Sequence, residues 1–62
     1  MNYTEIWNDG YNIYASSRNN ERTEHDARKA ARECLLCHVE EDELLAADIP
    51  QMLEDFEETY NL

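Results

Sequence analysis

The chain has 62 residues, a net charge of -10, one glycine and one proline, which leaves room for a single small domain. Its hydrophobic fraction of 42% is too high for a disordered acidic tail, so we expect a folded protein. A chain of this length buries only about 60% of its unfolded surface, so the core is small and the stability modest.

The charge is unevenly distributed along the chain. Residues 1–32 carry five acids and five bases, whereas residues 33–62 carry ten acids and no base. A field of one sign attracts basic partners and repels nucleic acid and anionic membranes. We therefore expect a basic protein partner, with no direct binding to nucleic acid or to a membrane.

The first residues do not have the features of a signal peptide. Residues 1–7 lack a basic start and a long apolar run. The longest uncharged apolar stretch, residues 34–37, is too short to cross a bilayer. We expect a cytoplasmic protein, or one in the host cytoplasm if a phage encodes it, whose two cysteines stay reduced.

Two segments rich in β-branched and aromatic residues, 3–7 and 11–15, flank an Asp9-Gly10 pair that suits a type I′ turn. The pattern predicts a β-hairpin over residues 3–15. In this register Tyr3, Trp7 and Tyr14 share one face and form an aromatic patch. A slip of one residue would exchange the faces, so the sequence leaves open which face is buried and whether Trp7 belongs to the core.

A helix is predicted over residues 23–38. Thr23 is its expected N-cap, with an acid three residues later, and Glu24 and Arg28 are spaced for an i,i+4 ion pair. Small and apolar residues then recur at steps of three and four, which is typical of one buried helical face. These residues are Ala27, Ala30, Ala31, Cys34, Leu35 and His38.

The acidic half predicts one or two short helices. Residues 40–47 form either a short helix or a loop, and an amphipathic acidic helix follows over residues 49–60, with Asp48 as its expected N-cap. The expected fold is a single α+β domain over residues 1–62. In it, the hairpin packs on the central helix and the order is ββαα or ββααα.

Residues Cys34 to His38 match the C-x-x-C-H pattern of haem attachment, but the chain lacks an export signal and the material for a haem pocket. A zinc site needs the same residues and His25, giving the set Cys34, Cys37, His38 and His25. Both cysteines fall inside a predicted helix and not on tight turns. The preferred interpretation is structural, without a metal or another cofactor.

Catalysis is not indicated. The carboxylates are numerous, but acid catalysis needs carboxyl groups in a cleft, and 62 residues supply little material for one. No serine stands in a nucleophile motif. We expect a binding protein and not an enzyme.

The acidic helices carry the leading functional hypothesis. Carboxylates spaced along two helices can imitate the phosphates of a nucleic-acid backbone, although charge runs are also common as plain solvated faces. In size, acidity and lack of catalytic motifs the chain resembles the small proteins with which phages and mobile elements disable host nucleases and other defence systems, among them anti-CRISPR and anti-restriction proteins. The hypothesis is an inhibitor that binds a basic nucleic-acid-handling enzyme or complex through Glu40, Glu41, Asp42, Glu43, Glu54, Asp55, Glu57 and Glu58, with Tyr3, Trp7 and Tyr14 as aromatic contacts.

Two alternatives stay open. The chain could be a non-mimic interaction module, such as an antitoxin or adaptor, that uses the aromatic hairpin face. It could also pair as a homodimer through an exposed strand edge and Leu36 to enlarge its core.

Overall fold

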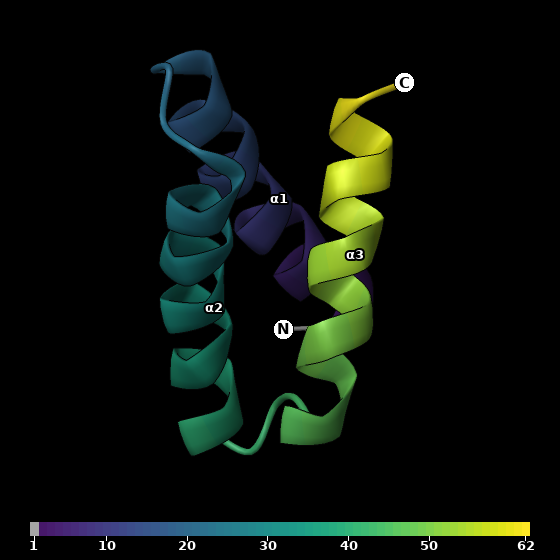
Figure 1. Cartoon of the computed structure of the whole chain (residues 1–62). Coiled ribbons are helices and arrows are strands. Elements are labelled where there is room, and N and C mark those ends of the chain that lie inside the picture. Colours follow the sequence, from purple (N-terminus) through teal and green to yellow (C-terminus); the bar gives the residue numbers. More distant parts are fainter. Residues whose placement is uncertain (1) are drawn as a thin grey trace.

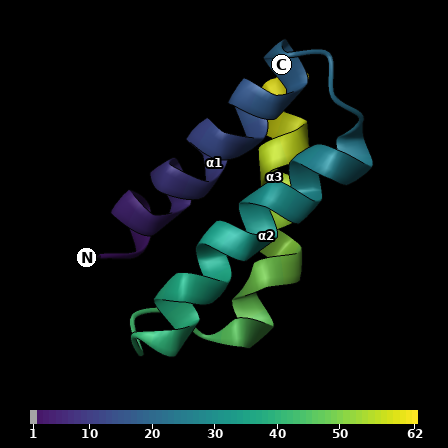
Figure 2. The ribbon, with the colours of Figure 1, turned by 90° about the vertical axis from the view of Figure 1, so that its left-hand side faces the viewer.

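The computed structural model describes residues 2–62, which form a small bundle of helices (Figure 1). The elements in chain order are α1 (Tyr3–Asn19), α2 (Glu24–Glu40), the 3₁₀ turn η1 (Ala46–Asp48) and α3 (Ile49–Tyr60). After α1 the chain reverses, so that α2 returns alongside it, and α3 packs against both (Figure 2).

The predicted β-hairpin, and with it the α+β fold class, is wrong. Residues 3–15 lie inside α1, and no strand occurs in the described range 2–62. Ile6, Gly10 and Tyr14 are the buried residues of this helix. Their spacing of four residues is a helical period, which places all three on one face. Burying this face against α2 and α3 outweighs the local preference of Asp-Gly for a turn.

Gly10 has a packing role in α1 and not a turn role. Its φ is not positive. A Cβ built on Gly10 would lie 2.7 Å from Cζ of Phe56 and 3.1 Å from Cδ2 of Leu35. The missing side chain therefore lets α1 approach both neighbouring helices. The N-terminus of α1 is capped by Asn2, whose Oδ1 accepts a hydrogen bond from the Glu5 backbone N–H at 2.9 Å.

The predicted helices over residues 23–38 and 49–60 correspond to α2 and α3. Thr23 caps α2 as expected, accepting a hydrogen bond from the Asp26 backbone N–H at 3.1 Å. The expected Asp48 cap is not formed, because its side chain makes no capping hydrogen bond. Residues 40–47 do not form a helix of their own. They contain the end of α2, a turn and the start of η1.

Both turns after the long helices use a residue in the left-handed region. Glu21 has φ 64° and Asp42 has φ 59°. Each turn returns two backbone hydrogen bonds to the helix, from Glu21 to Arg18 and from Arg22 to Ser17 after α1, and from Asp42 to Val39 and Glu43 to His38 after α2. This is the Schellman pattern, in which glycine usually takes the left-handed position.

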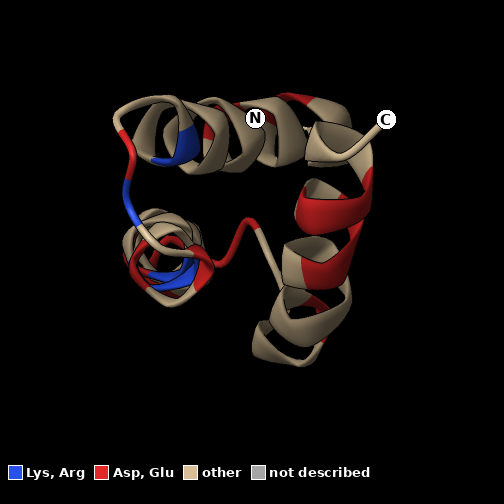
Figure 3. Cartoon of the chain, turned by 45° about the horizontal axis from the view of Figure 1, so that its top comes forward, with Lys and Arg blue, Asp and Glu red and all other residues tan. Residues whose placement is uncertain are grey.

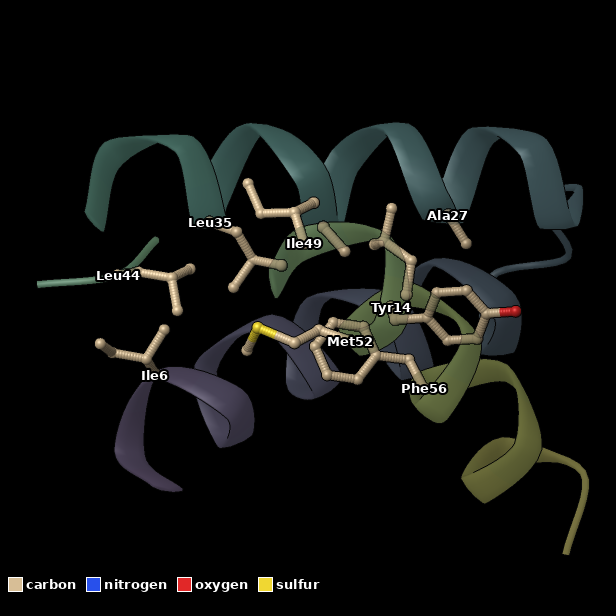
Figure 4. Close-up of a cluster of buried hydrophobic side chains, with 10 residues drawn as sticks. Ile6, Tyr14, Ala27, Leu35, Leu44, Ile49, Met52 and Phe56 are labelled. Carbon is tan, nitrogen blue, oxygen red and sulfur yellow. The ribbon is translucent and has the colours of Figure 1, made fainter. Parts of the chain in front are cut away.

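The core lies where the three helices meet (Figure 4). Phe56 is at its centre, with ring contacts to Trp7, Tyr11 and Tyr14 at centroid distances of 5.0, 6.0 and 6.2 Å. Leu44 extends the core into the turn between α2 and α3. The buried hydrophobic residues are Ile6, Tyr14, Ala27, Ala31, Leu35, Leu44, Ile49, Met52, Leu53 and Phe56.

Candidate interaction surface

Arg28 pairs with two acids at the contact between α2 and α3. Its guanidinium pairs with Glu24 on its own helix at 3.0 Å and with Glu57 on α3. Hydrogen bonding to Glu24 and to Arg28 holds the pKa of Glu57 below its ordinary value. Glu57, one of the predicted partner-binding acids, therefore serves as a link between α2 and α3.

Arg18 is also engaged within the fold. It donates a hydrogen bond from Nη1 to the Tyr14 hydroxyl at 2.9 Å and lies over the Tyr60 ring at 5.0 Å. The Tyr60 hydroxyl donates to Oδ1 of Asn19 at 2.7 Å, so the end of α1 is fastened to the end of α3. Two of the five basic residues are thus committed to internal contacts.

The outward side of α3 carries acidic side chains and no basic ones. Glu54 and Glu58 are exposed and lie one helical turn apart, and Asp55 is half-buried next to them. Figure 3 shows acidic bands along α3, which contains no Lys or Arg. Among residues 2–62 no basic side chain lies within ion-pair distance of Glu54 or Glu58. We call Glu54, Asp55 and Glu58 the α3 acidic face.

The other predicted acids lie in the turn after α2. Glu40, Glu41 and Asp42 are exposed, whereas Glu43 is half-buried with Oε1 3.6 Å from Nδ1 of His38. This turn is at the far end of α2, at the bottom of Figure 1. The eight predicted acids thus divide among an internal ion pair, the turn and the α3 acidic face.

The three predicted aromatic contacts have different environments. Tyr14 is fully buried and belongs to the core, so the predicted patch of Tyr3, Trp7 and Tyr14 does not form. Trp7 is half-buried and stacks on Tyr11 at 5.2 Å. Tyr3 is 51% exposed. The hairpin register predicted the wrong grouping, whereas the four-residue spacing of Tyr3, Trp7 and Tyr11 would have placed these three on one helical side.

Tyr3, on α1, is within electrostatic influence of the acids at and near the start of α3. Partial burial, then the charges of Asp48 and Asp55, raise the pKa of its hydroxyl. The charges of Asp48 and Asp55 thus act on an exposed tyrosine of the neighbouring helix. Aromatic side chains surrounded by charge are typical of protein interfaces.

The four residues weighed as a zinc set, Cys34, Cys37, His38 and His25, do not assemble among the described residues. Cys37 and His25 are exposed, and Cys34 is half-buried, where burial, then Asp9 and Cys37, raise the pKa of its thiol. Of the four residues, His38 alone belongs to a ligand cluster within the described part of the chain. Its partners there are Glu41 and Glu43, and the three ligand atoms lie within 4.8 Å of one another.

No pocket opens among residues 2–62, so the candidate site is an exposed surface. In the same range no helix combines the length and apolar character needed to cross a membrane. Comparisons with protein families, with curated proteins and with solved structures find no match to this chain. The functional argument therefore depends on the chain's own residues.

Proposed function

We propose that the protein is a small acidic inhibitor that binds a basic, nucleic-acid-handling enzyme or complex through the α3 acidic face. The observation that carries this proposal is the exposed pair Glu54 and Glu58, which lies on a helix without any basic residue. Self-repulsion of unpaired acids weakens a small fold, so a basic partner offers the missing compensation.

The spacing of these carboxylates suits a phosphate-binding surface. Residues four apart on an α-helix are separated by about 6 Å along its axis. One DNA strand carries a phosphate about every 3.4 Å along the duplex axis, so two phosphate steps cover a similar distance. A groove of Lys and Arg that binds phosphates can thus bind Glu54 and Glu58.

The remaining contacts give the proposed interface a second component. Tyr3 is exposed and feels the charge of Asp55, so we propose it as an aromatic anchor of the same interface. Tyrosine supplies buried contact area, and the carboxylates direct approach and orientation. The exposed acids Glu40, Glu41 and Asp42, at the C-terminal end of α2, add a second acidic segment to the proposed interface.

Capture and competition test the proposal. The immobilised protein is incubated with bacterial lysate at low salt, eluted with rising salt, and the eluted proteins are identified. We expect a basic nucleic-acid-binding protein that elutes with salt and is displaced by a DNA or RNA duplex. A specifically bound protein that persists at high salt and ignores the nucleic-acid competitor contradicts the proposal.

Matched variants separate the α3 acidic face from bulk charge. Glu54→Gln with Glu58→Gln removes two charges from this face. Asp26→Asn with Glu33→Gln removes two charges from exposed positions of α2. We expect the Glu54→Gln, Glu58→Gln variant to capture less partner and the Asp26→Asn, Glu33→Gln variant to capture as much as the unchanged chain. Equal loss in both variants would show that only net charge matters.

The alternative is a non-mimic adaptor or antitoxin that binds through aromatic contacts. The observation that favours it is the exposure of Tyr3, since the predicted hairpin face is absent. Tyr3→Ala would then abolish capture, while the Glu54→Gln, Glu58→Gln variant would keep it. Tyr3 is a better probe than Trp7, because Trp7 also packs against Phe56.

A further inference from the structure

The turn after α2 contains an imidazole nitrogen without a hydrogen-bond partner. Nδ1 of His38 is buried, and no described residue hydrogen-bonds to it. The nearest carboxylate oxygen, Oε1 of Glu43, is 3.6 Å away, beyond hydrogen-bond range. A buried, unsatisfied polar atom is unfavourable unless another group satisfies it.

Two carboxylates converge on the same position. Ligand atoms of His38, Glu41 and Glu43 all lie within 4.8 Å of one another. Hydrogen bonding to Glu43, followed by its charge, raises the pKa of Glu41, as expected for two carboxyl groups held close together. Ligands of a tetrahedral ion at metal–ligand distances of about 2.0–2.2 Å are separated by about 3.3–3.6 Å. Small side-chain rotations would reach that spacing, since Glu41 is exposed.

Asp9 is positioned on the other side of the imidazole ring. Its Oδ2 lies 3.9 Å from Nε2 of His38, and it comes from α1. Metal-binding histidines usually present their second ring nitrogen to a carboxylate, which favours a proton there and leaves the other nitrogen free to coordinate. Asp9 on the Nε2 side and Glu43 on the Nδ1 side match this arrangement.

We propose that Nδ1 of His38 and the carboxylates of Glu41 and Glu43 bind a divalent transition-metal ion, with Zn²⁺ as the best-suited probe. One imidazole and two carboxylates suit Zn²⁺ and leave a fourth position for water. The ion would satisfy the buried nitrogen and link the turn to the end of α2. This site does not depend on the α3 acidic face or on the function proposed for it.

Calorimetric titration of the chelator-treated full chain with Zn²⁺, in the presence of a non-thiol reductant, tests the site. We expect one saturable site. In thermal unfolding, free Zn²⁺ at about 100-fold the dissociation constant should raise the melting temperature by about 10 °C or more. Glu41→Gln should weaken binding at least about 10-fold. Glu40→Gln, an adjacent exposed position with the same charge change, should leave affinity within about twofold of the unchanged chain. Equal effects of the two variants would overturn the proposal.

Two further readouts identify the ligands without requiring a histidine variant to fold. Long-range ¹H–¹⁵N spectra should show a Zn²⁺-dependent shift of Nδ1 of His38 and no comparable shift of His25. Cys34→Ser with Cys37→Ser should retain the site. Loss of binding in the cysteine variant, or a His38 ring that responds to pH and not to Zn²⁺, would overturn it.

Discussion

Gly10 of α1 faces the ring of Phe56 so closely that a Cβ at this position would lie 2.7 Å from Cζ and 2.9 Å from Cε2. In an exposed helix, alanine is favoured over glycine by about 1 kcal/mol. At Gly10 the contact with Phe56 decides whether alanine stabilises or destabilises the protein. Phe56 is fully buried and cannot move aside freely, so the added Cβ is expected to be unfavourable.

Gly10→Ala is therefore expected to destabilise the protein by about 1–3 kcal/mol in urea or thermal unfolding. Asn12→Ala is the control, since Asn12 is an exposed position of the same helix. It should leave the free energy of unfolding unchanged or slightly raised. If Gly10→Ala stabilised the protein, the close packing of α1 against α3 would be wrong.

The turn after α1 offers a stabilising change. Glu21 has φ 64°, a conformation that strains a residue with a Cβ and not glycine. Glu21→Gly should raise the free energy of unfolding by about 0.5–1 kcal/mol, measured by urea denaturation. Glu21→Ala removes the same charge but keeps the Cβ, so it should not give this gain. Equal stabilisation by both would assign the effect to charge.

The helices that sequence patterns located well are those with explicit end signals. Thr23 begins α2, and Pro50 occupies the first turn of α3, where its missing N–H is harmless. For α1 the Asp9-Gly10 pair indicates a turn, and this signal hides the four-residue period that joins Ile6, Gly10 and Tyr14. Its glycine is explained by a contact with Phe56, 46 positions later in the numbering, which local patterns do not contain.

The candidate site was also predictable only where it depends on one helix. Glu54 and Glu58 follow from the outward side of a well-defined amphipathic helix. The pairing of Glu57 with Arg28 requires the relative position of α2 and α3, which no local pattern contains. The burial of Tyr14 likewise depends on recognising α1 as a helix.

The Arg28–Glu57 pair predicts a pH dependence of stability. Because the pKa of Glu57 is lower in the folded state than its ordinary value of 4.5, the ionised carboxylate stabilises the fold above about that pH. Its contribution is lost as pH falls through the lower folded-state value. Glu57→Gln should thus lower the urea midpoint at pH 7, and the difference from the unchanged protein should shrink as the solution is acidified below pH 4.5.

Glu58→Gln is the matched control for this pair. It removes one charge from the same helix at an exposed position without an ion pair among the described residues. It should leave the midpoint at pH 7 unchanged or raised, because it reduces repulsion among the acids. Equal midpoints for the two variants at pH 7 would contradict the stabilising role of Arg28–Glu57.

The most direct test of the proposed inhibitor function is the salt dependence of binding to the captured partner. The dissociation constant is measured between low and physiological salt for the unchanged chain, for Glu54→Gln with Glu58→Gln, and for Asp26→Asn with Glu33→Gln. We expect affinity to fall steeply with salt, the α3 variant to bind about 10- to 100-fold more weakly at low salt with a shallower dependence, and the α2 variant to follow the unchanged chain. An affinity that is insensitive to salt, or an α3 variant that binds as tightly as the unchanged chain, would contradict the account.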